Sequence, residues 1–136
     1  MLVIPKAYID GMISRSLEED PNECCGILAG VDERVTHLYH ITNTVRSPNR
    51  YLMDPQQQLD AMLDSERRNW VFLAFYHSHT HSPAYPSATD VRMALQSGYH
   101  EVYYILVSLE DKLVPKVRAF LIDETGAVSE EYFKVP

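Results

Sequence analysis

The sequence lacks several features that mark particular classes of protein. No apolar run approaches the roughly 20 residues that a helix needs to cross a bilayer, and the apolar stretch at residues 1–6 is too short for a signal peptide. Lysine and arginine form no run, and the net charge is −7, which disfavours phosphate-rich partners. We therefore expect a cytoplasmic protein that binds neither membranes nor nucleic acid.

Cysteine is also scarce, since the chain contains only Cys24 and Cys25. A disulfide between adjacent residues is strained, and two cysteines give no stabilising framework. The pair also lacks the two-residue spacing of common zinc sites, so we expect buried, reduced thiols that act as small hydrophobic residues.

The chain contains enough hydrophobic residues to form one core, because it has 136 residues and a hydrophobic fraction of 46%. A chain of this length is one domain of ordinary size, spanning residues 1–136. No repeat or interdomain linker interrupts it.

Hydrophobic periodicity and turn signals predict helices alternating with strands. Asp54 and Ser87 are the expected N-caps of the second and third helices. The result is a mixed α/β (α+β) fold with a largely antiparallel sheet flanked by helices. The expected elements are helices at 5–19, 55–69 and 87–96, a hairpin at 25–29 and 34–41 around a turn at 30–33, a buried strand at 70–76, and strands at 102–109, 117–122 and 128–135.

The segment that follows the buried strand carries an unusual concentration of histidine. In an extended chain His77 and His79 share one face, with Ser78 turned away, and Asp90 lies in the first turn of the next helix. Two imidazoles and a carboxylate suit zinc and leave a fourth position open for water. A solvated turn, or a hydrolytic triad of His79, Ser87 and Asp90, are simpler interpretations, but the clustering favours a metal.

These residues also carry a family resemblance. The run His77-Ser78-His79, with Ser87 eight positions after His79 and then Asp90, resembles the signature of the JAMM (MPN+) metallopeptidases. Upstream, the sequence PNECCGILAG at residues 21–30 is similar to the family pattern Pro-x-Glu-x-Cys-Gly-x-Leu-x-Gly. The resemblance covers nearly the whole chain and implies the cytidine-deaminase-like three-layer sandwich.

The resemblance also implies a role for each site residue. His77, His79 and Asp90 would be zinc ligands, Glu23 would be the acid and base that moves the proton of the attacking water, and Ser87 would stabilise the oxyanion. Hydrolysis of an amide needs these components: a Lewis acid, a proton shuttle and a hydrogen-bond donor. Taken alone, Glu23 would be interpreted as an exposed turn residue, and Ser87 as a helix cap only.

One position departs from the family pattern. Many members have proline directly after the second ligand histidine, whereas this chain has Thr80-His81. His81 is an alternative ligand, but the spacing to Ser87 and Asp90 is preserved by His77 and His79. We therefore place His81 outside the metal set.

The sequence Ala84-Tyr85-Pro86-Ser87 before the third helix resembles that of small bacterial members, among them those that act on ubiquitin-like sulfur-carrier proteins. This implies hydrolysis after the carrier's C-terminal Gly-Gly, releasing cysteine or another amine. A glycine tail can enter a narrow groove and add to a strand edge. Residues 43–53 are a candidate wall of that groove or an ordinary surface loop, and Tyr85 and Tyr99 are candidate exposed contacts for a protein partner.

The sequence also allows a test of two rival functions, a zinc deaminase and a non-catalytic scaffold. Zinc deaminases share the fold type but use His-x-Glu followed by Pro-Cys-x-x-Cys, and neither motif is present. Non-catalytic MPN scaffolds have usually lost metal ligands, whereas this chain retains all the expected ones. The sequence therefore favours a zinc peptidase over a scaffold.

Overall fold

A computed structural model describes all 136 residues as three helices packed on a six-stranded sheet. The elements follow the predicted order. They are α1 (Lys6–Glu19), β1 (Cys25–Val31), β2 (Arg34–Ile41), α2 (Pro55–Arg67), β3 (Val71–His79), α3 (Ala88–Ser97), β4 (Tyr103–Ser108), β5 (Lys116–Ile122) and β6 (Val128–Glu131).

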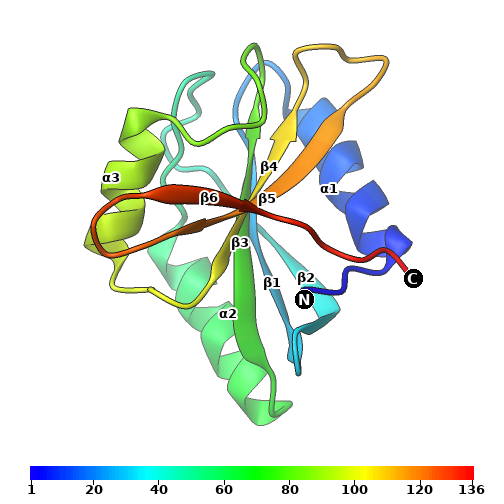
Figure 1. The fold of residues 1–136 in the computed structure, drawn as a ribbon, viewed down its shortest axis with the longest axis vertical. Helices are drawn as coiled ribbons and strands as arrows, with labels where there is room; N and C mark the ends of the chain where they lie inside the picture. Colours follow the sequence, from blue (N-terminus) through cyan, green and yellow to red (C-terminus); the bar gives the residue numbers. More distant parts are fainter.

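The sheet has the strand order β2-β1-β3-β4-β5-β6, and only the β3–β4 pair is parallel. Helix α1 lies on one face, and α2 and α3 lie on the other (Figure 1). Each face has its own core, with Met12 of α1 in one and Ala61 and Ala94 of α2 and α3 in the other. The predicted three-layer fold with a largely antiparallel sheet is confirmed.

The hairpin between β1 and β2 is tighter than predicted. Residues 30 and 31 continue β1, so the turn consists of Asp32 and Glu33 alone, with φ angles of 51° and 61°. Two central residues with positive φ are typical of the type I′ turn that matches the twist of paired strands.

The prediction that the last strand extends to residue 135 was wrong, because β6 ends at Glu131. The chain beyond it pairs with the N-terminal segment instead: Ile4 N–H donates to Lys134 O (2.9 Å). Val3 in turn forms parallel bridges with both Arg34 and Lys134, which brings the two termini side by side (Figure 1).

The most consequential feature concerns β3, which continues past the apolar run predicted at 70–76 and ends at His79. Its parallel pairing with β4 continues to the pair His79–Ser108, and Leu109 N–H donates to His79 O (2.9 Å). Both histidines of the motif are therefore held in a regular, paired strand rather than in a turn.

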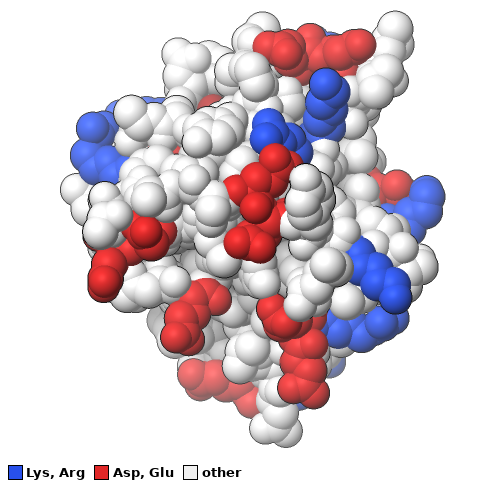
Figure 2. Space-filling view, in the orientation of Figure 1, with Lys and Arg blue, Asp and Glu red and all other residues white.

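No helix is long and apolar enough to span a membrane. Figure 2 shows acidic and basic side chains dispersed over one face, with acidic groups gathered where β6 crosses its middle. One of the β6 carboxylates, Glu130, pairs with Arg118 of β5 at 2.7 Å. Charge on this face is thus partly neutralised between neighbouring strands.

Candidate functional site: a His-His-Asp cluster beside a buried glutamate

Strand β3 places His77 and His79 on the same face, the one covered by α2 and α3. Their neighbour on this face, Phe75, belongs to the core beneath the two helices, and Ser78 points to the opposite face. The two histidines are only 2% and 4% exposed. The alternation of side chains in the strand therefore presents both imidazoles to α3.

The third member of the cluster comes from the first turn of α3. Ser87 is the N-cap: its Oγ accepts the Asp90 N–H (3.0 Å), and Asp90 Oδ2 accepts the Ser87 N–H (2.9 Å). This reciprocal capping box satisfies two free N–H groups of the helix start. It also fixes the Asp90 carboxylate, because the oxygen held by the cap is the one that faces the histidines.

Three atoms of these residues converge. His77 Nε2 lies 3.2 Å from His79 Nε2, and Asp90 Oδ2 lies 3.1 Å from the first and 2.9 Å from the second. Ligands around a tetrahedral zinc ion with bonds of 2.0–2.1 Å are about 3.3 Å apart. The cluster therefore has the donor types and nearly the spacing that a metal ion such as zinc requires, and these residues can hold one.

The electrostatics of the cluster also favour a cation. Burial by itself would raise the pKa of Asp90, but hydrogen bonds from His77 and His79 outweigh it and hold the pKa well below its usual range. Burial lowers the pKa of His77. For His79 burial acts in the same direction, but the Asp90 carboxylate and the Pro83 carbonyl outweigh it and raise the pKa. An ionised carboxylate facing two buried imidazoles is a site for positive charge.

Groups around the cluster fix its geometry. His79 Nδ1–H donates to Pro83 O (2.9 Å), so in the neutral imidazole Nε2 is the nitrogen that can bind a metal ion. The ring of Tyr51 stacks on His77, with centroids 4.5 Å apart and an interplanar angle of 29°. Such outer contacts set the tautomer and the orientation of metal-binding histidines.

Glu23 reaches the site because it lies two residues before the start of β1, which pairs with β3 in a register that places Cys25 opposite His77. Ser78 strengthens this junction: its Oγ accepts the Cys24 N–H (2.9 Å), and its N–H donates to Cys24 O (3.0 Å). The interpretation of Glu23 as an exposed turn residue is wrong, since the residue is 5% exposed.

The Glu23 carboxyl group is under-satisfied. Its Oε1 is buried and has no hydrogen-bond partner. Desolvation raises the pKa of Glu23 to about 8, opposed by attraction to His79 and reinforced by repulsion from Asp90. A buried polar atom without a partner is costly in free energy, and such atoms are often found where a substrate or water is to be bound.

The remaining predicted residues have distinct surroundings. Ser87 is exposed, and its hydroxyl accepts the cap hydrogen bond but donates to no group in the structure. Its cap role is confirmed, and its oxyanion role stays a prediction. His81 is exposed and lies outside the His77–His79–Asp90 group, with Nδ1 2.8 Å from Thr80 Oγ1.

The two cysteines are buried and free, as predicted. The prediction of an exposed Tyr99 was wrong: the residue is half-buried, with its ring 4.9 Å from that of Phe75. Tyr85 is 50% exposed.

Sequence reasoning assigned no role to Asn43, Tyr51 or Ser78. For Ser78 a signal existed, because a polar residue on the core-facing side of a buried strand needs a hydrogen-bond partner. For Asn43 and Tyr51 no such signal exists, since both belong to a loop whose path is fixed only by tertiary contacts.

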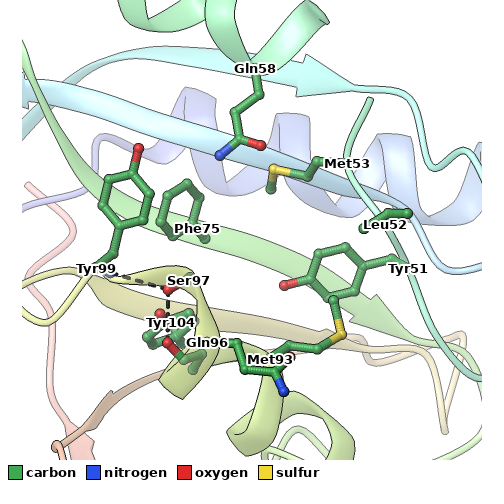
Figure 3. Close-up of a pocket in the computed structure, with 11 residues that line it drawn as sticks. Tyr51, Leu52, Met53, Gln58, Phe75, Met93, Gln96, Ser97, Tyr99 and Tyr104 are labelled. Carbon is green, nitrogen blue, oxygen red and sulfur yellow. Dashed lines mark hydrogen bonds between the residues drawn. The ribbon is translucent and has the colours of Figure 1, made fainter. Parts of the chain in front are cut away.

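A cavity of about 360 Å³ adjoins the cluster between α2, α3 and the loop at 51–53. It shares Tyr51 with the histidines and α3 with Asp90. Figure 3 shows Tyr99 and Phe75 on one side of the cavity and Tyr51 on the other, with Gln58 of α2 between them. Eight of its 11 lining residues are hydrophobic, so it suits an apolar group bound close to the cluster.

The sequence is similar to a known protein family and to characterised relatives. Residues 5–126 match the family described as prokaryotic homologs of the JAB domain. The CysO-cysteine peptidase of Mycobacterium tuberculosis is 37% identical over 133 residues, covering 96% of this chain and 88% of that protein. The desampylase of Pyrococcus furiosus is 28% identical over 129 residues, covering 95% and 86%.

A solved structure is also closely similar. The solution structure of a protein from Desulfitobacterium hafniense has a TM-score of 0.87 and 33% sequence identity, covering 100% of this chain and 93% of that one. Fold and sequence thus agree over almost the full length. The chain belongs to the JAMM/MPN family, through its group of prokaryotic homologs of the JAB domain.

Proposed function

We propose that this JAMM-type hydrolase is a zinc-dependent peptidase that cleaves the amide or isopeptide bond after the C-terminal Gly-Gly of a ubiquitin-like sulfur-carrier protein. Cysteine, or another amine joined there, is released. The observation that carries the proposal is the convergence of His77, His79 and Asp90 within 3.2 Å beside the unpartnered carboxyl of Glu23. The peptidase and desampylase names of the relatives support the substrate class.

In this proposal His77, His79 and Asp90 hold the zinc ion. Zinc supplies a Lewis acid that polarises the scissile carbonyl and lowers the pKa of water to about 7. Glu23 takes a proton from the water that attacks the carbonyl carbon and delivers it to the nitrogen as the C–N bond breaks. The products are a carrier carboxylate and a free amine, and the Glu23 carboxyl returns to its starting state.

The surroundings of Glu23 suit both steps. A group that must accept and then donate a proton works best with a pKa near the operating pH, and burial raises the pKa of Glu23 to about 8 in the metal-free protein. Its free Oε1 leaves room for a hydrogen bond to the reacting water. The unused hydroxyl hydrogen of Ser87 is the proposed donor to the oxyanion.

The substrate tail has a candidate track along residues 51–53. On one side this segment pairs with the residues that follow β2: Thr44 N–H donates to Leu52 O (2.9 Å), and Asp54 N–H donates to Thr42 O (3.0 Å). On its other side the main-chain groups of Tyr51 and Met53 have no partner. An extended Gly-Gly tail can add to this free edge, with the apolar cavity receiving the side chain that precedes the glycines.

The test combines zinc analysis with mass spectrometry. Purified protein is assayed for zinc and incubated with a ubiquitin-like carrier that ends in Gly-Gly-Cys, with and without a chelator. Loss of cysteine that the chelator abolishes and added zinc restores is the expected result. Bound zinc without cleavage of this tail, or of a Gly-Gly isopeptide conjugate, would reject the proposed substrate, and protein without zinc would favour a scaffold.

A further inference from the structure

Asn43 lies where the chain leaves β2, and it uses every hydrogen-bonding position of its side chain. Its Nδ2 donates to Glu23 O (3.0 Å) and to Arg50 O (3.2 Å). Its Oδ1 accepts from Val45 N–H (3.2 Å) and Leu52 N–H (2.9 Å). The residue is 9% exposed, so these bonds form out of contact with most of the solvent, where an unmade bond is costly.

The bond to the main chain of Glu23 matters because no hydrogen bond holds the Glu23 carboxyl group itself. Oε1 has no partner, so the direction of the side chain depends on its main chain and on packing. Both main-chain polar groups of Glu23 bind the same loop: its N–H donates to Ser47 O (2.9 Å), and its carbonyl accepts from Asn43. The loop at 43–53 therefore clamps the peptide groups on either side of this carboxylate.

The same side chain also organises the other wall of the site. By binding Arg50 O and Leu52 N–H, Asn43 holds the residues on both sides of Tyr51. Tyr51 in turn stacks on His77 at 4.5 Å and lines the apolar cavity. One buried amide thus links the proton shuttle to the segment that packs on a metal ligand.

We propose that Asn43 is a positioning residue for Glu23. It fixes the main chain of Glu23 so that the unpartnered carboxyl oxygen faces the His77–His79–Asp90 cluster and the nitrogen of the leaving amine. This inference rests on the proposed peptidase function. It gives the loop at 43–53 a catalytic role beyond that of a groove wall.

The test replaces Asn43 with aspartate, which keeps the two acceptor bonds and removes both donors. Hydrolysis is measured on two substrates with the same carrier and Gly-Gly acyl part, one an amide of cysteine and the other an ester. An amine leaves only when it is protonated, whereas an alcohol depends less on that proton. We expect unchanged zinc content, a fall of about 10–100-fold in kcat on the amide, and a rise in the ratio of ester to amide rates.

Thr44→Val is the matched control. Thr44 is in the same loop, and its Oγ1 donates to Leu52 O (3.1 Å) without contacting Glu23. We expect this variant to change KM alone and to leave the ester-to-amide ratio at the wild-type value. If Asn43→Asp fails to fold, Asn43→Ser provides the same measurement with one hydroxyl donor in place of the amide.

Equal losses on both substrates, or no loss on either, would overturn the role of Asn43. Loss of zinc in the Asn43 variant would also overturn it, because the effect would then belong to the metal site. Wild-type protein that cleaves neither substrate would reject the peptidase function itself, and with it this inference. The two failures are therefore distinguishable from one set of assays.

Discussion

The two halves of the site differ in how their polar atoms are satisfied. In the His77–His79–Asp90 cluster each converging atom lies within 3.2 Å of the other two, and the carboxylate is also held by the helix cap. Glu23, on the far side of the site, is buried with an oxygen that has no partner. The first half can hold a cation, and the second has a free acceptor oxygen, which in the proposed mechanism binds the reacting water.

The two halves also depend on different kinds of structure, one on local elements and the other on long-range pairing. The cluster comes from residues 77–90 and is fixed by a strand, a helix cap and one loop carbonyl. Glu23 joins it from more than 50 positions away in the sequence, through the pairing of β1 with β3 and the loop at 43–53. Substitutions should therefore separate metal binding from proton transfer.

Loss of Asp90 should have the largest effect. We expect Asp90→Ala to lose zinc and to lower kcat/KM by more than about 10⁴-fold, because both the anionic ligand and the acceptor in the helix cap are gone. Asp90→Asn is the matched variant, since its amide oxygen can still cap α3 while the charge is absent. Zinc analysis and thermal unfolding separate the two contributions; wild-type zinc content in Asp90→Ala would exclude Asp90 as a ligand.

Replacing Glu23 should spare the metal. We expect Glu23→Gln to bind zinc with wild-type stoichiometry and to lose about 10²–10⁴-fold in kcat, the range for a general acid and base. Metal analysis and turnover of the Gly-Gly-Cys substrate are measured on the same preparation. Turnover at the wild-type rate would reject the proposed mechanism.

The same variant should stabilise the metal-free protein, and the gain should depend on pH. The folded-state pKa of Glu23 is about 8 against an ordinary value of 4.5, so from pH 4.5 to 8 the unfolded chain loses this proton first and wild-type stability falls. The advantage of Glu23→Gln should be near zero at pH 4 and roughly 2–4 kcal/mol at pH 8. Urea unfolding in chelator at both values checks this, and a difference independent of pH would contradict it.

Ser87 should show a smaller, composite effect. Ser87→Ala removes the N-cap, which costs about 1 kcal/mol of stability, and the proposed oxyanion donor, which should lower kcat by about 10–100-fold. Ser87→Asp restores the cap but has no hydroxyl, whereas Ser87→Thr keeps both. Recovery of activity in Ser87→Asp would show that Ser87 acts through the cap alone.

His81 should matter least. Because its side chain is exposed and lies outside the cluster, we expect His81→Ala to keep its zinc and to change kcat by less than about 3-fold, as for most surface substitutions. His79→Ala is the comparison, with loss of zinc expected. Loss of zinc in His81→Ala would show that the ligand set had been assigned wrongly.

Much of this protein could be predicted from its sequence. Apolar periodicity predicted the order of helices and strands, and the spacing from His77 to Asp90 predicted the cluster, because both reflect local geometry: alternation along a strand and the first turn of a capped helix. The caps Asp54 and Ser87 are confirmed by their bonds to the N–H groups of Gln57 and Asp90.

The tertiary structure decided what local geometry could not. That Glu23 is buried rather than an exposed turn residue follows from strand register and from its bonds to Ser47 and Asn43, and neither is encoded in the residues next to it. The extension of β3 to His79 likewise depends on pairing with β4, almost 30 residues later. Sequence therefore determined which groups can bind a metal and, through the family motif, singled out Glu23, whereas long-range pairing decided that this carboxyl is buried and how its main chain is held.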